Sequence, residues 1–239
     1  MRILRGDGPP IRIGHRGAAA LAPENTLEAL RAGIAHGCDY VEFDVLSRPD
    51  GALVLAHSAH ELPDDFATFD ETLALLAAEG VGAHVDLKQR GLEEGVGAAL
   101  RDHDLLERSL VSSLDWAALR DLRRYEPELR VGLSYPEDRY GLSGRRTFAP
   151  LLAGGLAAMK WTLPRLIGRW LDRVAASAAV VHRQLVTPSL IRVCHDRGTA
   201  VWAWTVNDPA EAHALVEWGA DAIITDDPRI LGPNKQSTG

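Results

Sequence analysis

Two carboxylates stand two residues apart within the apolar segment Tyr40–Val45, whose sequence is YVEFDV. Valine, phenylalanine and tyrosine favour a β-strand, in which side chains point alternately to the two faces. Glu42 and Asp44 therefore leave the same face, while the apolar residues between them leave the other face and must be buried. Two carboxylates this close repel each other, and proteins usually balance them with a divalent cation or with basic side chains.

Further polar residues stand at or just beyond the ends of other predicted strands, namely His15, Arg16, His57, Asp86 and Lys88. Asp86 adds a third carboxylate, and three carboxylates form a hard oxygen site for Mg²⁺ or Ca²⁺. Arg16 and Lys88 supply positive charge for the non-bridging oxygens of a phosphate group. One histidine can take a proton from an attacking hydroxyl or water while the other gives a proton to the leaving alcohol. Together these residue types predict metal-assisted cleavage of a phosphodiester.

The same residues also have a purely structural interpretation. Glu42 and Asp44 can pair with Arg16 and Lys88 in an ion-pair network that perturbs pKa values without catalysis. The other histidines are interpreted as structural or surface residues: His36, His60, His84, His103, His182, His195 and His213.

Predicted strands and helices alternate along the chain. The strands cover residues 11–14, 40–45, 83–87, 110–113, 130–134, 178–181, 200–206 and 222–225, with a short extended segment at 52–56. Helices are predicted at residues 25–36, 69–79, 91–103, 115–125, 188–197 and 209–218. This alternation implies a parallel sheet, and eight such units in 239 residues predict a (β/α)8 TIM barrel. An open doubly wound sheet is the alternative, but no glycine-rich phosphate loop follows the first strand.

A barrel of this type carries its chemistry where strands end and helices begin. The candidate residues stand at such ends, so the fold predicts that they converge on one site. No linker, repeat or low-complexity segment divides the chain. Residues 1–239 are therefore predicted to form a single domain, with its core at about residues 11–228.

Composition limits the function further. The formal net charge of −7 argues against a broad nucleic-acid-binding surface. The two isolated cysteines, Cys38 and Cys194, indicate a reducing compartment rather than a disulfide framework. The sequence contains neither a signal-peptide core nor a run of about 18 apolar residues. We therefore predict a cytoplasmic protein without a transmembrane segment.

The long connection between residues 139 and 177 contains a basic amphipathic segment. Apolar residues at helical spacing run beside three arginines: Leu166, Ile167, Trp170, Leu171 and Val174 beside Arg165, Arg169 and Arg173. Pro164 is predicted to stand at the start of this helix. One interpretation is weak contact of residues 164–175 with a membrane surface. The favoured interpretation is an outer helix of the barrel with a solvated arginine side.

Several motifs together resemble the glycerophosphodiester phosphodiesterase family. They are His15-Arg16-Gly17, Pro23-Glu24-Asn25-Thr26, Glu42-Phe43-Asp44-Val45, Asp50-Gly51 and His57, followed by Ser112-Ser113, Trp204-Thr205-Val206-Asn207 and Gly219-Ala220-Asp221-Ala222-Ile223-Ile224-Thr225-Asp226. The resemblance extends from about residue 11 to about residue 228. No single motif is specific, but the combination of motifs, order and spacing is.

The resemblance implies a barrel that cleaves a glycerophosphodiester to an alcohol and glycerol 3-phosphate. The attacking group is either water or the substrate's own neighbouring hydroxyl. Three kinds of site residue are implied: ligands of a divalent cation (Mg²⁺ or Ca²⁺) at Glu42, Asp44 and Asp86, acid–base catalysts at His15 and His57, and phosphate contacts at Arg16 and Lys88. Separately, Trp204 at a predicted strand end is a possible substrate contact that would stack on the glycerol, and packing within the barrel explains it equally well.

Three features depart from the family pattern. Ser58 stands where the family usually has an aspartate, Asp86 stands where it usually has a glutamate, and the segment between His57 and Phe69 is short. Asp86 and an open mouth favour an alternative, a lysophospholipase D or sphingomyelinase D type of enzyme acting on a lysolipid or other lipid. Ser58 supports another alternative, a barrel that has lost catalysis and only binds phosphorylated ligands. The headgroup, the choice of ion and the oligomeric state stay open.

Overall fold

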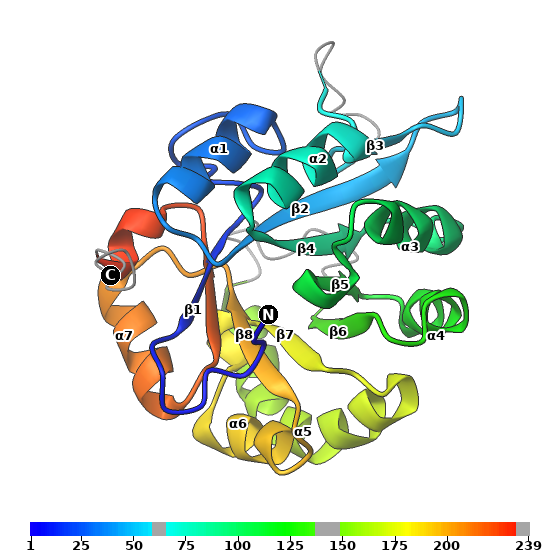
Figure 1. Cartoon of the computed structure of the whole chain (residues 1–239). Helices are drawn as coiled ribbons and strands as arrows, with labels where there is room; N and C mark the ends of the chain where they lie inside the picture. Colours follow the sequence, from blue (N-terminus) through cyan, green and yellow to red (C-terminus); the bar gives the residue numbers. More distant parts are fainter. Residues whose placement is uncertain (59–65, 137–148, 233–239) are drawn as a thin grey trace.

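The strands form a closed parallel barrel. The computed structural model describes residues 1–58, 66–136 and 149–232. Within these residues eight parallel strands surround a common axis (Figure 1): β1 (Ile11–Gly14), β2 (Tyr40–Ser47), β4 (Gly82–Leu87), β5 (Ser109–Ser113), β6 (Arg130–Tyr135), β7 (Ala178–His182), β8 (Ala200–Trp204) and β9 (Ala222–Thr225). β1 pairs with β9 on one side and with β2 on the other, so the sheet closes on itself. The predicted (β/α)8 TIM barrel is confirmed, and β3 (Leu53–Leu55) pairs antiparallel with the end of β2.

Helices lie around the outside of the strands (Figure 1). In the described part of the chain the α-helices are α1 (Leu27–Ala35), α2 (Phe69–Glu79), α3 (Glu93–Asp102), α4 (Trp116–Tyr125), α5 (Ala149–Val174), α6 (Pro188–His195) and α7 (Pro209–Trp218). Short 3-10 helices lie at η1 (Leu106–Arg108), η3 (Arg183–Leu185) and η4 (Pro228–Leu231).

Local capping signals set the ends of α2 and α7. Thr68 accepts a hydrogen bond from the backbone N–H of Glu71, whose side chain returns a contact to Thr68, and Gly80 ends α2 in the left-handed conformation. Asp208 caps the start of α7 and Gly219 ends it, again in the left-handed conformation. Both helices therefore have the bounds that the sequence predicts.

The outward face of β2 forms part of the core beneath the helices. Val41, Phe43 and Val45 are buried there together with Leu30 of α1 and Leu73 of α2. This packing confirms the prediction that the apolar face of the carboxylate strand is buried. The opposite face of β2 therefore points into the interior of the barrel.

The inward faces of the strands fill the barrel with apolar side chains toward its amino-terminal end. Tyr40 and Trp202 meet edge to face there, with ring centroids 5.2 Å apart. Because side chains alternate, Glu42 and Asp44 continue the inward face of β2 beyond Tyr40. The interior thus changes from an apolar floor to a polar upper part at the carboxyl ends of the strands.

The prediction that a helix begins at Pro164 is wrong, because Pro164 lies inside α5. A proline within a helix removes one backbone hydrogen bond. The residues that precede it include many alanines and leucines, which favour a helix and continue it upstream.

The apolar side of α5 is buried against the barrel. Leu163, Ile167, Leu171 and Val174 belong to the main core, and α5 packs against α4, α6 and β6. This packing explains the amphipathic pattern, because a helix in the outer ring of a barrel buries one apolar side against the strands. Most of the apolar side that a membrane surface would need is therefore occupied by protein. None of the helices in the described residues is both long enough and apolar enough to cross a bilayer.

Candidate active site

The loop after β1 fits tightly between α1 and β2. A Cβ atom on Gly14 would lie 2.0 Å from the carbonyl oxygen of Gly17, and Gly17 itself has a φ of +91°. A Cβ atom on Gly17 would lie 2.4 Å from the carbonyl carbon of Ala29. The backbone N–H of Arg16 donates to Oε2 of Glu42 at 2.8 Å. This close approach fixes the positions of His15 and Arg16 beside the carboxylate strand.

We expect the substitution Gly17→Ala to lower the free energy of unfolding by roughly 1–3 kcal/mol more than Gly51→Ala does, the usual scale of overpacking. Both glycines have a positive φ, but nothing lies within 4 Å of a Cβ built on Gly51. The Gly51 variant therefore controls for the backbone conformation alone. Urea unfolding of the two variants measures the difference, and equal losses would show that the close approach to Ala29 is unimportant.

Three carboxylates converge at the ends of β2 and β4. Glu42 and Asp44 point inward from β2, and the register of the sheet sets Asp86 of β4 directly beside Asp44. One oxygen from each of the three carboxylates lies within 4.8 Å of the others. Glu42 and Asp44 are buried and Asp86 is half-buried. The predicted meeting of the three acids is thus present in the structure.

Asp44 is surrounded by groups that stabilise its negative charge. Its Oδ1 lies 2.8 Å from Nζ of Lys88, and its Oδ2 lies 3.1 Å from Nε of Arg16 and 3.1 Å from Nδ1 of His57. The Asn25 side-chain amide also donates to Oδ2. Burial alone would raise the pKa of Asp44, but the contact with His57 and the charges of Lys88 and Arg16 hold it well below its usual range.

Fewer groups compensate the charge of Glu42, among them the backbone N–H of Arg16. Among the described residues, the basic side-chain atom nearest to Glu42 is Nε2 of His15, 4.0 Å from Oε2. Burial, and then the charge of Asp44, raise the pKa of Glu42 to about 7. The described residues therefore leave a buried carboxylate whose ionised form needs further positive charge. Hard oxygen donors with this deficit fit a divalent cation of the Mg²⁺ or Ca²⁺ type.

His15 is oriented by a carboxylate from the last barrel strand. Its Nδ1 lies 2.6 Å from Oδ1 of Asp226, which follows β9, and the Asn207 side-chain amide donates to the other oxygen of Asp226. Burial would lower the pKa of His15, but the charge of Glu42 and the contact with Asp226 outweigh burial and raise it. Asp226 and Asn207 belong to motifs that the sequence singles out, but the sequence gives them no role.

His57 is oriented by Asp44. Its Nδ1 lies 3.1 Å from Oδ2 of Asp44 and 3.0 Å from Nη2 of Arg16. An Nδ1–H that donates to the ionised Asp44 cannot also accept from Arg16, so the carboxylate contact decides the tautomer. His57 therefore has a carboxylate partner that does not depend on Ser58.

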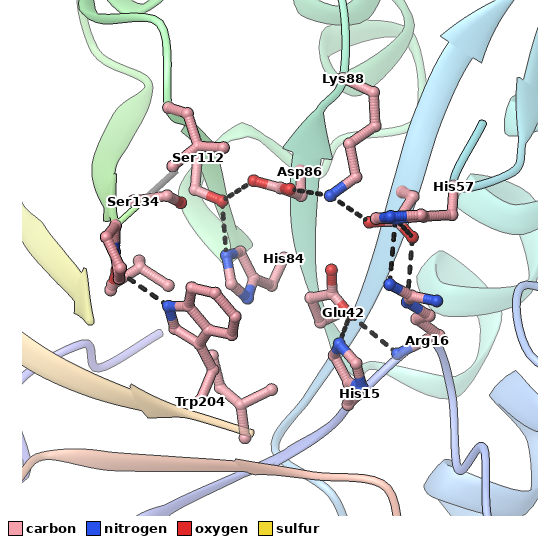
Figure 2. A pocket seen from close by; sticks show the side chains of 15 residues that line it. His15, Arg16, Glu42, His57, His84, Asp86, Lys88, Ser112, Ser134 and Trp204 are labelled. Carbon is pink, nitrogen blue, oxygen red and sulfur yellow. Dashed lines mark hydrogen bonds and ion pairs between the residues drawn. The ribbon is translucent and has the colours of Figure 1, made fainter. Parts of the chain in front are cut away.

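All eight residues that the sequence predicts for the site line one pocket of about 420 Å³. Figure 2 shows the side chains of this pocket. Strands β1, β2 and β4 supply its charged side, whereas Leu114, Pro136, Val180, Trp204 and Ile224 supply an apolar side. Nε1 of Trp204 donates to the carbonyl of Val180 at 3.1 Å, which fixes the ring. Most of the short segment after His57, expected to open the mouth, lies outside the described residues.

His84, which the sequence leaves as a structural or surface residue, is buried and also lines this pocket (Figure 2). The Ser112 hydroxyl donates to Oδ1 of Asp86 at 2.6 Å and lies 3.0 Å from Nε2 of His84. Burial lowers the pKa of His84 to about 4, so its neutral ring donates Nε2–H to Ser112. Side chains two residues apart on a strand share one face, so His84 lies on the same face of β4 as Asp86, just as Glu42 and Asp44 share a face of β2. The sequence alone therefore indicates that His84 points inward.

A family of known proteins matches most of this chain. A family model described as the glycerophosphoryl diester phosphodiesterase family matches residues 15–140 and 97–230. The chain is 24% identical to a glycerophosphodiester phosphodiesterase of Caldanaerobacter subterraneus, over 92% of this chain and 95% of the relative. It is also 24% identical to a lysophospholipase D of Mus musculus, over 93% of this chain and 81% of the relative.

Solved structures share the fold. An Oleispira antarctica phosphodiesterase in complex with the product sn-glycerol-3-phosphate matches with a TM-score of 0.72 at 23% identity, over 93% of this chain and 95% of that one. A glycerophosphodiester phosphodiesterase from Agrobacterium tumefaciens matches with a TM-score of 0.70 at 20% identity, over 93% and 99% of the two chains. At these identities the structural likeness concerns the barrel fold.

Proposed function

The chain belongs to the glycerophosphoryl diester phosphodiesterase family and is a glycerophosphodiester phosphodiesterase; on that premise we propose that it uses a divalent cation and two histidines to hydrolyse its substrate. The observation that carries the proposal is the convergence of Glu42, Asp44 and Asp86, with oxygens within 4.8 Å of one another, in the pocket that His15 and His57 also line. The products are an alcohol and glycerol 3-phosphate.

Glu42, Asp44 and Asp86 are the proposed ligands of the cation. When bound, Mg²⁺ or Ca²⁺ neutralises the charge that develops on the phosphoryl group. The raised pKa of Glu42 supports this assignment, because a cation beside Glu42 would favour its ionised form.

Arg16 and Lys88 are the proposed partners of the phosphate oxygens. Both side chains line the pocket, and both remain charged at neutral pH. Burial would lower the pKa of Lys88, but Asp86 and Asp44 outweigh burial and raise it. Two cations beside the metal site complement the charge of a phosphodiester in a partly buried pocket.

His15 and His57 are the proposed proton carriers. Each Nδ1 contacts a carboxylate, Asp226 for His15 and Asp44 for His57, so each ring keeps Nε2 for proton transfer. One ring removes a proton from the attacking oxygen, and the other gives a proton to the alcohol oxygen as its bond to phosphorus breaks. The net reaction consumes one water, whether water attacks directly or hydrolyses a cyclic phosphate formed by the substrate's own hydroxyl.

Trp204 is a proposed substrate contact on the apolar side of the pocket, where its ring is held by the hydrogen bond to Val180. A fixed aromatic face suits the carbon atoms of a glycerol moiety.

Incubation of the protein with glycerophosphocholine and Mg²⁺ or Ca²⁺, followed by ³¹P NMR, tests the proposal. We expect the phosphodiester signal to be replaced by that of glycerol 3-phosphate, with release of choline. Release of choline phosphate and glycerol would contradict the proposed direction of cleavage. Binding of glycerol 3-phosphate without any turnover would instead favour the barrel that has lost catalysis.

A further inference from the structure

A second hollow, of about 260 Å³, adjoins the active-site pocket at the carboxyl end of the barrel. Leu114 and Ser134 line both cavities, so the two lie side by side. The second hollow carries no carboxylate among its lining residues, and most of its lining is aromatic or aliphatic. We call it the aromatic hollow.

Three elements build the aromatic hollow. Trp116 begins α4, Tyr135 ends β6 and Trp170 belongs to α5. The rings of Tyr135 and Trp170 pack together, with centroids 5.4 Å apart. The guanidinium of Arg173 lies 4.8 Å from the centre of the Trp116 ring, and this cation–π contact holds a ring that is 42% exposed. The hollow thus has walls of packed aromatic rings, and the Trp116 ring of its lining is exposed.

A contrasting cavity shares Leu114 and Trp116 with the aromatic hollow. Its lining includes Asp86, Lys88 and Arg90, which carry charge. A hydrocarbon chain that enters this cavity from the active-site pocket would have to displace the water that hydrates these charged groups. The aromatic hollow offers the same chain an apolar surface, so the chemistry of the two cavities determines which one it enters.

We propose that the aromatic hollow binds the single hydrocarbon chain of a monoacyl glycerophosphodiester, that is, a lysophospholipid, while its phosphate lies in the active-site pocket. The inference rests on the proposed function, because it assumes that the pocket cleaves glycerophosphodiesters. Cleavage consumes one water, breaks the bond between phosphorus and the headgroup oxygen, and releases the headgroup alcohol and an acylglycerol 3-phosphate. One hollow of this volume suits one chain and not the two chains of a diacyl phospholipid.

The test measures kcat/KM for glycerophosphocholine and for lysophosphatidylcholines with chains from acetyl to octanoyl, all kept below their micelle concentrations. We expect kcat/KM to rise by about two- to fourfold for each added methylene until the hollow is filled, because burial of a methylene group favours binding on that scale. A flat series would overturn the inference while leaving the proposed function standing. Failure to cleave any of these diesters would overturn both.

Trp116→Ala supplies the matched variant, because Trp116 lines the aromatic hollow but not the active-site pocket. We expect it to lower kcat/KM for the octanoyl substrate by about tenfold, from lost apolar contact, and to leave kcat/KM for glycerophosphocholine unchanged. Trp218→Ala is the control, since Trp218 ends α7 and is 48% exposed. Equal effects of the two variants on the octanoyl substrate, or an equal loss of both substrates in Trp116→Ala, would contradict a chain-binding role.

Discussion

We expect His15→Ala and His57→Ala each to lower kcat for glycerophosphocholine by roughly 10²–10⁴-fold, the usual contribution of a general acid or base. Each substitution removes the imidazole ring, and with it the Nε2 atom that we propose for proton transfer. The carboxylate that contacts the ring, Asp226 for His15 and Asp44 for His57, stays in place. Steady-state assays at saturating substrate and cation measure the loss.

A change of leaving group separates the roles of the two histidines. A nitrophenyl phosphodiester has a leaving group that needs little protonation, so it should restore activity to the variant that lacks the general acid and not to the variant that lacks the general base. His213→Ala is the matched control, because its side chain is 76% exposed on α7. If both His15 and His57 variants kept the activity of the His213 variant, neither residue would act in proton transfer.

The proposed cation ligands are also expected to affect turnover strongly. We expect Glu42→Gln and Asp86→Asn each to lower turnover by at least about 10²-fold, because a bound cation contributes several kcal/mol of transition-state stabilisation. These two substitutions are more informative than one at Asp44, which also contacts Arg16, Lys88 and His57. Assays over a range of Mg²⁺ and Ca²⁺ concentrations reveal whether excess cation restores activity.

The unfolding free energy of the Glu42 variant distinguishes a metal site from a structural ion-pair network. A carboxylate whose pKa is raised by burial destabilises the fold when it is ionised, so without cation Glu42→Gln should be at least as stable as the wild-type protein at neutral pH. Glu217→Gln, at an exposed position on α7, controls for loss of charge alone. A Glu42→Gln variant that unfolds more easily yet retains turnover would favour the structural interpretation.

Much of the fold follows from local signals in the sequence. Strands that alternate with helices predict the barrel, and the caps at Thr68 and Asp208 define α2 and α7 because each helix end is set by residues close in sequence. The sequence does not reveal where α5 begins, because Pro164 is compatible with the first turn of a helix and yet lies inside this one.

The candidate site also combines features that local sequence patterns predict with a contact that depends on the closed barrel. The period of two along a strand places Glu42 beside Asp44, and the parallel order of β2 and β4 brings Asp86 to them. The contact between His15 and Asp226 joins residues 211 positions apart, and it depends on closure of the barrel between β1 and β9. No local pattern carries that information, whereas the inward position of His84 follows from the alternation along β4.

Isothermal titration calorimetry of Mg²⁺ and Ca²⁺ into chelator-treated protein measures directly whether Glu42, Asp44 and Asp86 bind a cation. We expect at least one of the two ions to bind the wild-type chain with one ion per chain, and we expect Glu42→Gln and Asp86→Asn, but not Glu217→Gln, to weaken this binding. Absence of binding for both ions, or binding of equal strength in all four proteins, would show that these acids do not hold a catalytic cation.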